Sequence, residues 1–133
     1  MDLKTIIINF NKIIENLLEQ TQNMTDTSYL FYFKKIIRVN SLKPIQTFYK
    51  YAYIHKKYII EKNPKYFLND NNIKKNLDNN YDEYFIEIIK LKQIYINIDD
   101  DSKENLWKIL NALVILTDKY IEINSYKLNN ISC

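Results

Sequence analysis

The chain has 133 residues, of which 47% are hydrophobic and 26% are charged, and its formal net charge at pH 7 is +3. This length and this balance are typical of one globular domain, so we expect residues 1–133 to form a single helical domain. The chain contains no glycine and only one cysteine, Cys133, which excludes P-loops, glycine-rich dinucleotide-binding loops and internal disulfide bonds.

A membrane span needs roughly 20 mostly apolar residues, and the longest apolar runs, such as Ile6–Ile8 and Leu113–Leu116, are far shorter. The N-terminus mixes charged and apolar residues, whereas a signal peptide has an uninterrupted apolar stretch. We therefore expect an intracellular protein without a membrane span.

The first predicted helix runs from about Asp2 to Gln20. Asp2 can accept hydrogen bonds from the free amides of the first turn and so cap the helix. Apolar residues recur at three- and four-residue steps, which is the spacing of one helix face. They are Leu3, Ile7, Phe10, Ile14 and Leu17, with Ile6, Ile13 and Leu18 widening the stripe. After a polar stretch, a second helix is predicted from Asp26 or Thr27 to about Val39.

A third helix is predicted from Pro44 to about Glu61. Proline suits the first turn, where its missing N–H group costs nothing, and Pro64 prevents the helix from continuing far. The apolar residues of this helix form two faces, which indicates burial on both sides or an aromatic surface that awaits a partner. We expect a short turn at Tyr66–Leu68, loops around it, and a fourth helix over about residues 81–98.

The fifth predicted helix covers about residues 102–124 and follows Asp99–Asp101, an acidic run that favours the positive N-terminal end of a helix. The last aspartate of the run and Glu104 have the spacing of a capping box. Apolar residues, Trp107 among them, cover nearly half the circumference, which is typical of a buried central helix. We therefore predict an all-α fold, a compact bundle of about five principal helices with this long C-terminal helix central, followed by a short tail at residues 125–133.

No catalytic, cofactor-binding or metal site is expected. An EF-hand loop needs spaced oxygen ligands and a glycine, and neither accompanies Asp99–Asp101, so helix capping is the favoured role of this run. His55 is the only histidine and lies in line with the apolar Ala52 and Ile59. Acid–base catalysis needs positioned partners, and nothing local supports a pairing with Cys133. We predict a partly buried, hydrogen-bonded core histidine.

Composition and charge are both biased. Isoleucine, asparagine, lysine and tyrosine supply 71 of the 133 residues, which indicates a very AT-rich genome. Residues 34–75 carry eleven lysines and arginines against two acidic residues, a net charge of +9, while residues 76–133 carry a net charge of −4.

The basic segment can neutralise the phosphates of a nucleic acid, or it can be a solvated face or a patch that meets an acidic patch of another copy. The latter alternatives are favoured, because codon bias inflates lysine and a single arginine leaves little for bidentate phosphate contacts. The candidate contact residues for a partner or a nucleic acid are Lys34, Lys35, Arg38, Lys56, Lys57, Lys62 and Lys65.

The segment Asn105–Leu113, preceded by Asp101–Glu104, resembles a pattern in small uncharacterised helical proteins of nucleocytoplasmic large DNA viruses. In that pattern an acidic, lysine-containing turn precedes a helix with a tryptophan and spaced leucines. The aromatic-rich stretch Phe48–Leu68 is similar in character, and the likeness covers about half of the chain. The chain departs from the pattern at Ile109, where an aromatic residue is expected. The resemblance implies a viral origin and a helical fold, and it carries no activity.

The chain is also similar in size and helical character to the Bcl-2-like bundles of poxviruses, although it lacks the glycine-containing motif of cellular Bcl-2 proteins. The leading expectation is a non-enzymatic structural or interaction protein of a virion or replication factory, in the host cytoplasm or the virion. Its partner would be another protein or a second copy of itself. The alternatives are a nucleic-acid-associated protein that uses residues 34–75 and a Bcl-2-like module that modulates the host.

Overall fold

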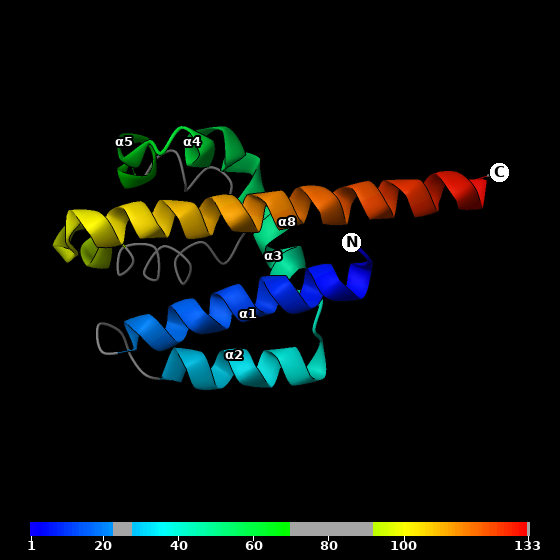
Figure 1. Ribbon diagram of the computed structural model, residues 1–133, viewed down its shortest axis with the longest axis horizontal. Coiled ribbons are helices and arrows are strands. Elements are labelled where there is room, and N and C mark those ends of the chain that lie inside the picture. Colours follow the sequence, from blue (N-terminus) through cyan, green and yellow to red (C-terminus); the bar gives the residue numbers. More distant parts are fainter. Residues whose placement is uncertain (23–27, 70–91, 133) are drawn as a thin grey trace. The chain divides into compact units, whose positions relative to one another are not determined.

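The computed structural model describes residues 1–22, 28–69 and 92–132, and the side-chain surroundings of residues 1–22, 29–69 and 92–125. All regular elements in these residues are helices, which confirms the predicted all-α class (Figure 1). No described helix combines the length and the apolarity that a membrane crossing requires. In chain order the elements are α1 (Leu3–Thr21), α2 (Ser28–Val39), α3 (Lys43–Tyr51), the 3-10 helix η1 (Tyr53–His55), α4 (Lys56–Ile60), α5 (Pro64–Leu68) and α8 (Asp100–Ser132).

The contacts of the chain divide it into two compact units that share α8. The first unit contains Met1–Ile54 and Ala112–Cys133, and the second contains His55–Asn111. The long C-terminal helix therefore takes part in both units. A single domain over the whole chain stays a prediction.

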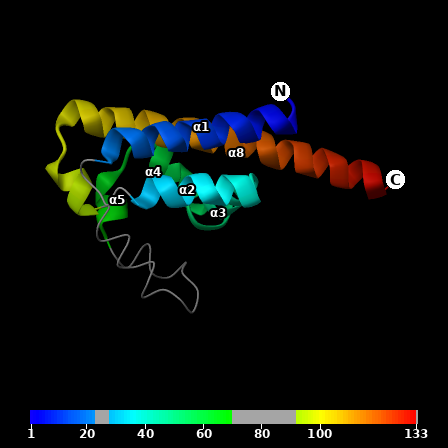
Figure 2. The ribbon, with the colours of Figure 1, turned by 90° about the horizontal axis from the view of Figure 1, so that it is seen from below.

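In the first unit α1, α2 and α3 pack against one another, and α2 runs beside α1 in the opposite direction (Figures 1 and 2). The predicted cap of α1 is confirmed, because Asp2 Oδ1 accepts a hydrogen bond from the Thr5 amide at 2.8 Å. Phe10 is fully buried, and its ring meets the Phe48 ring edge-on at 5.6 Å between centroids. The buried apolar residues of this unit are Ile6, Ile7, Phe10, Ile45, Leu113, Val114 and Leu116.

The single third helix predicted from Pro44 to Glu61 is wrong. The chain forms α3, η1 and α4 in succession, and the backbone leaves the α-helical conformation at His55, where φ is −102° and ψ is 18°. The two ends of the predicted helix pack in different units, because Ile45 is buried in the first unit whereas His55 and Ile59 are buried in the second. In a straight helix these residues lie along one stripe, so the break allows each end of that stripe to pack within its own unit.

The short turn predicted at Tyr66–Leu68 is confirmed and forms α5. The Asn63 side chain accepts a hydrogen bond from the Tyr66 amide at 3.1 Å, and Pro64 occupies the first turn. Just before this cap, Lys62 has a φ of 54°, in the left-handed region that residues other than glycine adopt uncommonly. This reversal separates α4 from α5.

Two predicted helices extend into parts of the chain that the structure does not describe. The second helix is confirmed as α2 from Ser28 onward, and its expected start at residues 26–27 lies outside the described residues. The fourth is helical over residues 92–97, and the Ile98 amide donates to the Ile94 carbonyl at 3.1 Å. Its remaining portion, residues 81–91, is also outside the described residues.

The helix predicted over residues 102–124 begins earlier and ends later, as α8. Asp99 caps it, since Asp99 Oδ1 accepts a hydrogen bond from the Ser102 amide at 2.7 Å. The predicted capping box of Asp101 and Glu104 is therefore wrong. The predicted end is also wrong, because residues 125–132, expected as a tail, continue the helix to Ser132. No proline or glycine lies within α8 to stop it.

Candidate partner-binding surface

The apolar content of α2 exceeds what one neighbour can cover. Residues 29–33 form an unbroken aromatic and aliphatic run, and five consecutive residues span more than one full turn of a helix. Leu30, Phe33 and Ile37 recur at three- and four-residue steps and are half-buried, as expected of the face that packs against α1 and α3. Four other apolar side chains of α2 are left at the surface, namely Phe31, Tyr32, Ile36 and Val39.

Three exposed side chains form the α2 apolar stripe, namely Tyr32, Ile36 and Val39. They are 57%, 43% and 89% exposed. Their spacing of four and then three residues places them in one row along the helix. Single exposed apolar residues are ordinary, whereas a contiguous apolar surface rimmed by polar groups marks an interaction site.

Cations flank this stripe. Phe31, Lys35 and Arg38 repeat the same four-and-three spacing one position earlier, and all three are exposed. The Lys35 ammonium lies 4.5 Å from the centroid of the Phe31 ring, a cation–π contact. Lys34 is also exposed, and its Nζ lies 3.8 Å from Glu15 Oε1, a surface ion pair of little energetic value. Since α2 contains no acidic residue, its exposed side is electropositive.

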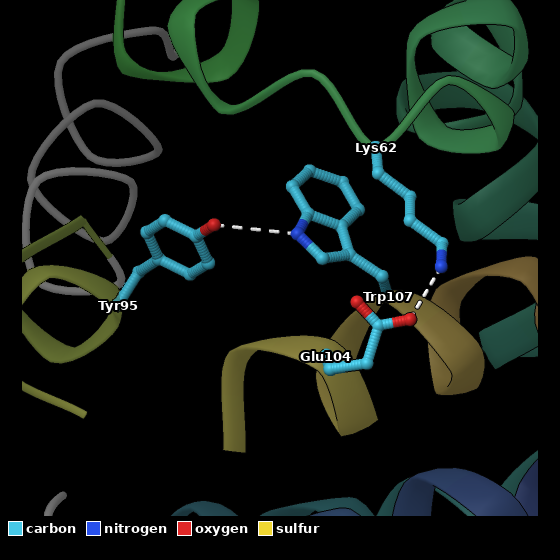
Figure 3. Close-up of polar contacts among 4 residues, drawn as sticks. All are labelled: Lys62, Tyr95, Glu104 and Trp107. Carbon is cyan, nitrogen blue, oxygen red and sulfur yellow. Dashed lines mark hydrogen bonds and ion pairs between the residues drawn. The ribbon is translucent and has the colours of Figure 1, made fainter. Parts of the chain in front are cut away.

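The seven predicted contact residues are all exposed, but they divide between the two units. The structure brings Lys34, Lys35 and Arg38 together on α2 and places the others in the second unit. There the Lys62 ammonium donates to Glu104 Oε1 (Figure 3), and this hydrogen bond is the main cause that holds the pKa of the Glu104 carboxyl below its usual value. The predicted residues in the second unit are Lys56, Lys57, Lys62 and Lys65.

An aromatic cluster fills the second unit. Trp107 is 7% exposed, which confirms its predicted burial. Its indole Nε1 donates a hydrogen bond to Tyr95 Oη at 3.3 Å (Figure 3), and its ring centroid lies 5.9 Å from that of Phe67. The cluster thereby joins α5, α8 and helical residues 92–97.

His55 belongs to the same unit and has a packing role. It is 4% exposed, and its Nδ1 lies 2.6 Å from Tyr66 Oη, which confirms a hydrogen-bonded core histidine. The Tyr66 ring stacks on the Tyr58 ring with 3.6 Å between centroids. Burial, and to a smaller extent Tyr58, raises the pKa of the Tyr66 hydroxyl above its usual value. Tyr66 thus remains protonated and able to donate to His55 at neutral pH.

A shallow groove of about 380 Å³ lies between α1 and α8 within the first unit. Its lining combines aliphatic side chains with polar ones. The lining offers amides and one ammonium group but no acid–base pair, so it fits a contact surface better than a reaction site. The lining residues are Asn9, Lys12, Ile13, Asn16, Ala112, Ile115 and Leu116.

The candidate contacts predicted from the sequence were cations alone, and the α2 apolar stripe was missed. The signal that could have revealed it is the run at residues 29–33, which is too long for one buried face. Which part of the run stays exposed depends on where α1 and α3 pack, and that is a tertiary property.

No protein-family model, curated protein or solved structure matches this chain.

Proposed function

We propose that this protein is a non-enzymatic interaction protein that binds a protein partner through one face of α2. We call this face the α2 contact face. The observation that carries the proposal is an exposed apolar row beside exposed cations on one helix. Tyrosine and arginine are enriched at the centres of protein interfaces, where large side chains become desolvated. The α2 contact face consists of Phe31, Tyr32, Lys35, Ile36, Arg38 and Val39.

A protein partner fits this face better than a nucleic acid does. Ile36 and Val39 have no aromatic ring on which a base can stack, and phosphates do not bind aliphatic side chains. Among the predicted cations, Lys62 is already paired with Glu104, and Lys34 lies near Glu15. The Phe31–Lys35 pair is the one element that would also suit single-stranded nucleic acid.

A site-specific photo-crosslinker tests the proposal in the cells that naturally contain this protein. We expect a crosslinker at Tyr32 or Ile36 to capture protein. Ile8 on α1, which is 53% exposed, provides the matched control position and should capture none. The charge reversal Lys35→Glu/Arg38→Glu should abolish the crosslinks from Ile36. Crosslinks to DNA or RNA alone, or equal capture from Ile8, would contradict a protein-binding role for α2.

The viral origin remains a proposal based on the resemblance at Asn105–Leu113. An interaction protein of this kind suits a virion or a replication factory, where repeated contacts between small proteins build the assembly. Immunogold labelling of infected cells with an antibody to the protein tests this placement. Labelling of neither virions nor factories would contradict it.

A further inference from the structure

The second unit presents a surface that is complementary to the α2 contact face. Ile96, on helical residues 92–97, is 56% exposed. Asp99, Asp100 and Asp101 come after two intervening residues, Asn97 and Ile98, and all three aspartates are exposed. We call Ile96 and these three aspartates the acidic segment.

Two carboxylates of the acidic segment are available to a partner. Asp99 caps α8 through its bond to the Ser102 amide. In the part of the chain that the structure describes, no lysine or arginine forms an ion pair with Asp100 or Asp101. The nearest lysine in sequence, Lys103, places its ammonium 5.3 Å from the Tyr95 ring centroid.

The two surfaces match in chemistry, and their charged groups match in number. The α2 contact face offers an apolar row and two cations, Lys35 and Arg38, whose charges no acidic group in the described residues neutralises. The acidic segment offers one exposed aliphatic side chain, Ile96, and the carboxylates of Asp100 and Asp101.

We infer that the α2 contact face of one copy binds the acidic segment of a second copy. This inference rests on the proposed function and names the partner as the chain itself. Ile96 of the second copy packs on the α2 apolar stripe, and its two free aspartates pair with Lys35 and Arg38. Because the two surfaces differ, the contact is heterologous, and each copy carries one of each. Association therefore proceeds head to tail, into rings or open chains.

The size of the contact sets its strength. The twelve residues of α2 form a helix of about 18 Å, so this face alone supplies less than the roughly 800 Å² per partner of a standard interface. Self-association is consequently weak and depends on concentration. It also depends on salt, because the screening length falls from about 8 Å at physiological ionic strength to about 3 Å at 1 M.

Light scattering and sedimentation of the full chain test the inference. We expect the average mass of the wild type to rise above the 16.2 kDa of one chain as concentration increases, and to return toward it at high salt. Lys35→Glu/Arg38→Glu and Asp100→Asn/Asp101→Asn should each remain monomeric, with the helical content of the wild type. Two matched controls, Lys4→Glu/Lys119→Glu and Glu19→Gln/Glu122→Gln, change exposed charges elsewhere and should associate as the wild type does.

Mixing the two deficient variants gives the decisive measurement. Each retains the surface that the other has lost, so an equimolar mixture has one functional interface per pair. It should form dimers of twice the monomer mass and nothing larger. A wild type that stays monomeric at low salt, variants that associate normally, or a mixture that stays monomeric would each overturn the inference.

The crosslinking experiment separates this inference from the proposed function. If α2 captures a different protein while the purified chain stays monomeric, the self-association inference fails and the proposed function stands. If α2 captures no protein and the chain stays monomeric, both fail. Wild-type binding to DNA, RNA or anionic lipid vesicles that is lost in Lys35→Glu/Arg38→Glu, without self-association, would also overturn the inference.

Discussion

Trp107 is held by contacts of two kinds, a hydrogen bond to Tyr95 and ring packing against Phe67. Trp107→Ala removes both and leaves a cavity, so we expect it to lower the free energy of unfolding by about 3–5 kcal/mol. Trp107→Phe keeps an aromatic ring and should cost less. Urea denaturation monitored by circular dichroism gives the free energy of unfolding of both variants. Native fluorescence should be blue-shifted and move red on unfolding, and a water-like native emission would contradict the burial of Trp107.

Asn11 is a buried polar residue with an incompletely bonded amide. Its Nδ2 donates to the Ser41 carbonyl at 3.0 Å, while its Oδ1 has no partner among the described residues. Asn11→Leu removes the unpaired acceptor and leaves the Ser41 carbonyl to bind water, because Ser41 is exposed. We expect the variant to be more stable by about 1 kcal/mol. Asn11→Asp, which buries a charge, is the opposing control and should be destabilised. Thermal unfolding gives the melting temperatures of both variants and of the wild type. Equal destabilisation of Asn11→Leu and Asn11→Asp would show that the Oδ1 atom has a partner.

At the scale of the helices, the N-terminal cap of α8 distinguishes neighbouring aspartates. Asp99→Ala should lower the melting temperature more than Asp101→Ala, because only Asp99 accepts the Ser102 amide. Asp99→Asn keeps a capping acceptor and should retain most of the stability. A larger loss of melting temperature in Asp101→Ala than in Asp99→Ala would show that Asp101 caps α8.

The same cap predicts a pH dependence. The Ser102 amide lowers the pKa of the Asp99 carboxyl below its usual 3.8. A group with a lowered folded-state pKa stabilises the protein above its unfolded-state pKa and loses this effect as the pH falls through the folded-state pKa. The stability difference between the wild type and Asp99→Asn should therefore shrink below about pH 4. Denaturation midpoints measured from pH 7 to pH 2 test this, and a constant difference would contradict it.

Helix type and most helix ends follow from local chemistry, whereas the break within residues 44–61 does not. Pro44 and Pro64 mark starts that their ring geometry favours. The break at His55 has no breaking residue, since no proline or glycine lies between Pro44 and Glu61. It arises because Ile45 and Ile59 pack in different units, and periodicity within one segment carries no information about a second unit.

At the scale of the whole molecule, the chain passes between the two units twice, between Ile54 and His55 and, within α8, between Asn111 and Ala112. Asn111 is exposed, so its replacement tests the helix backbone and not side-chain packing. Asn111→Pro should cost about 3 kcal/mol or more and separate the unfolding of the two units into two transitions. Asn111→Ala should preserve the single transition expected of the wild type. Urea titrations followed by circular dichroism and by Trp107 fluorescence, which reports on the second unit, show whether the transitions coincide. Coincident transitions in Asn111→Pro would contradict a coupling role for α8.

The sequence by itself determined the all-helical class, the cap at Asp2, the burial of Trp107 and the core role of His55, because helix periodicity and capping act within a few residues. Only the tertiary structure decided which predicted cations share a surface. It placed Lys35 and Arg38 beside an exposed apolar row and joined Lys62 to Glu104, forty-two residues away in sequence. The physical reason is that the exposure of a side chain depends on whether a neighbouring helix covers its face. The sequence of one helix does not specify which of its faces another helix will cover.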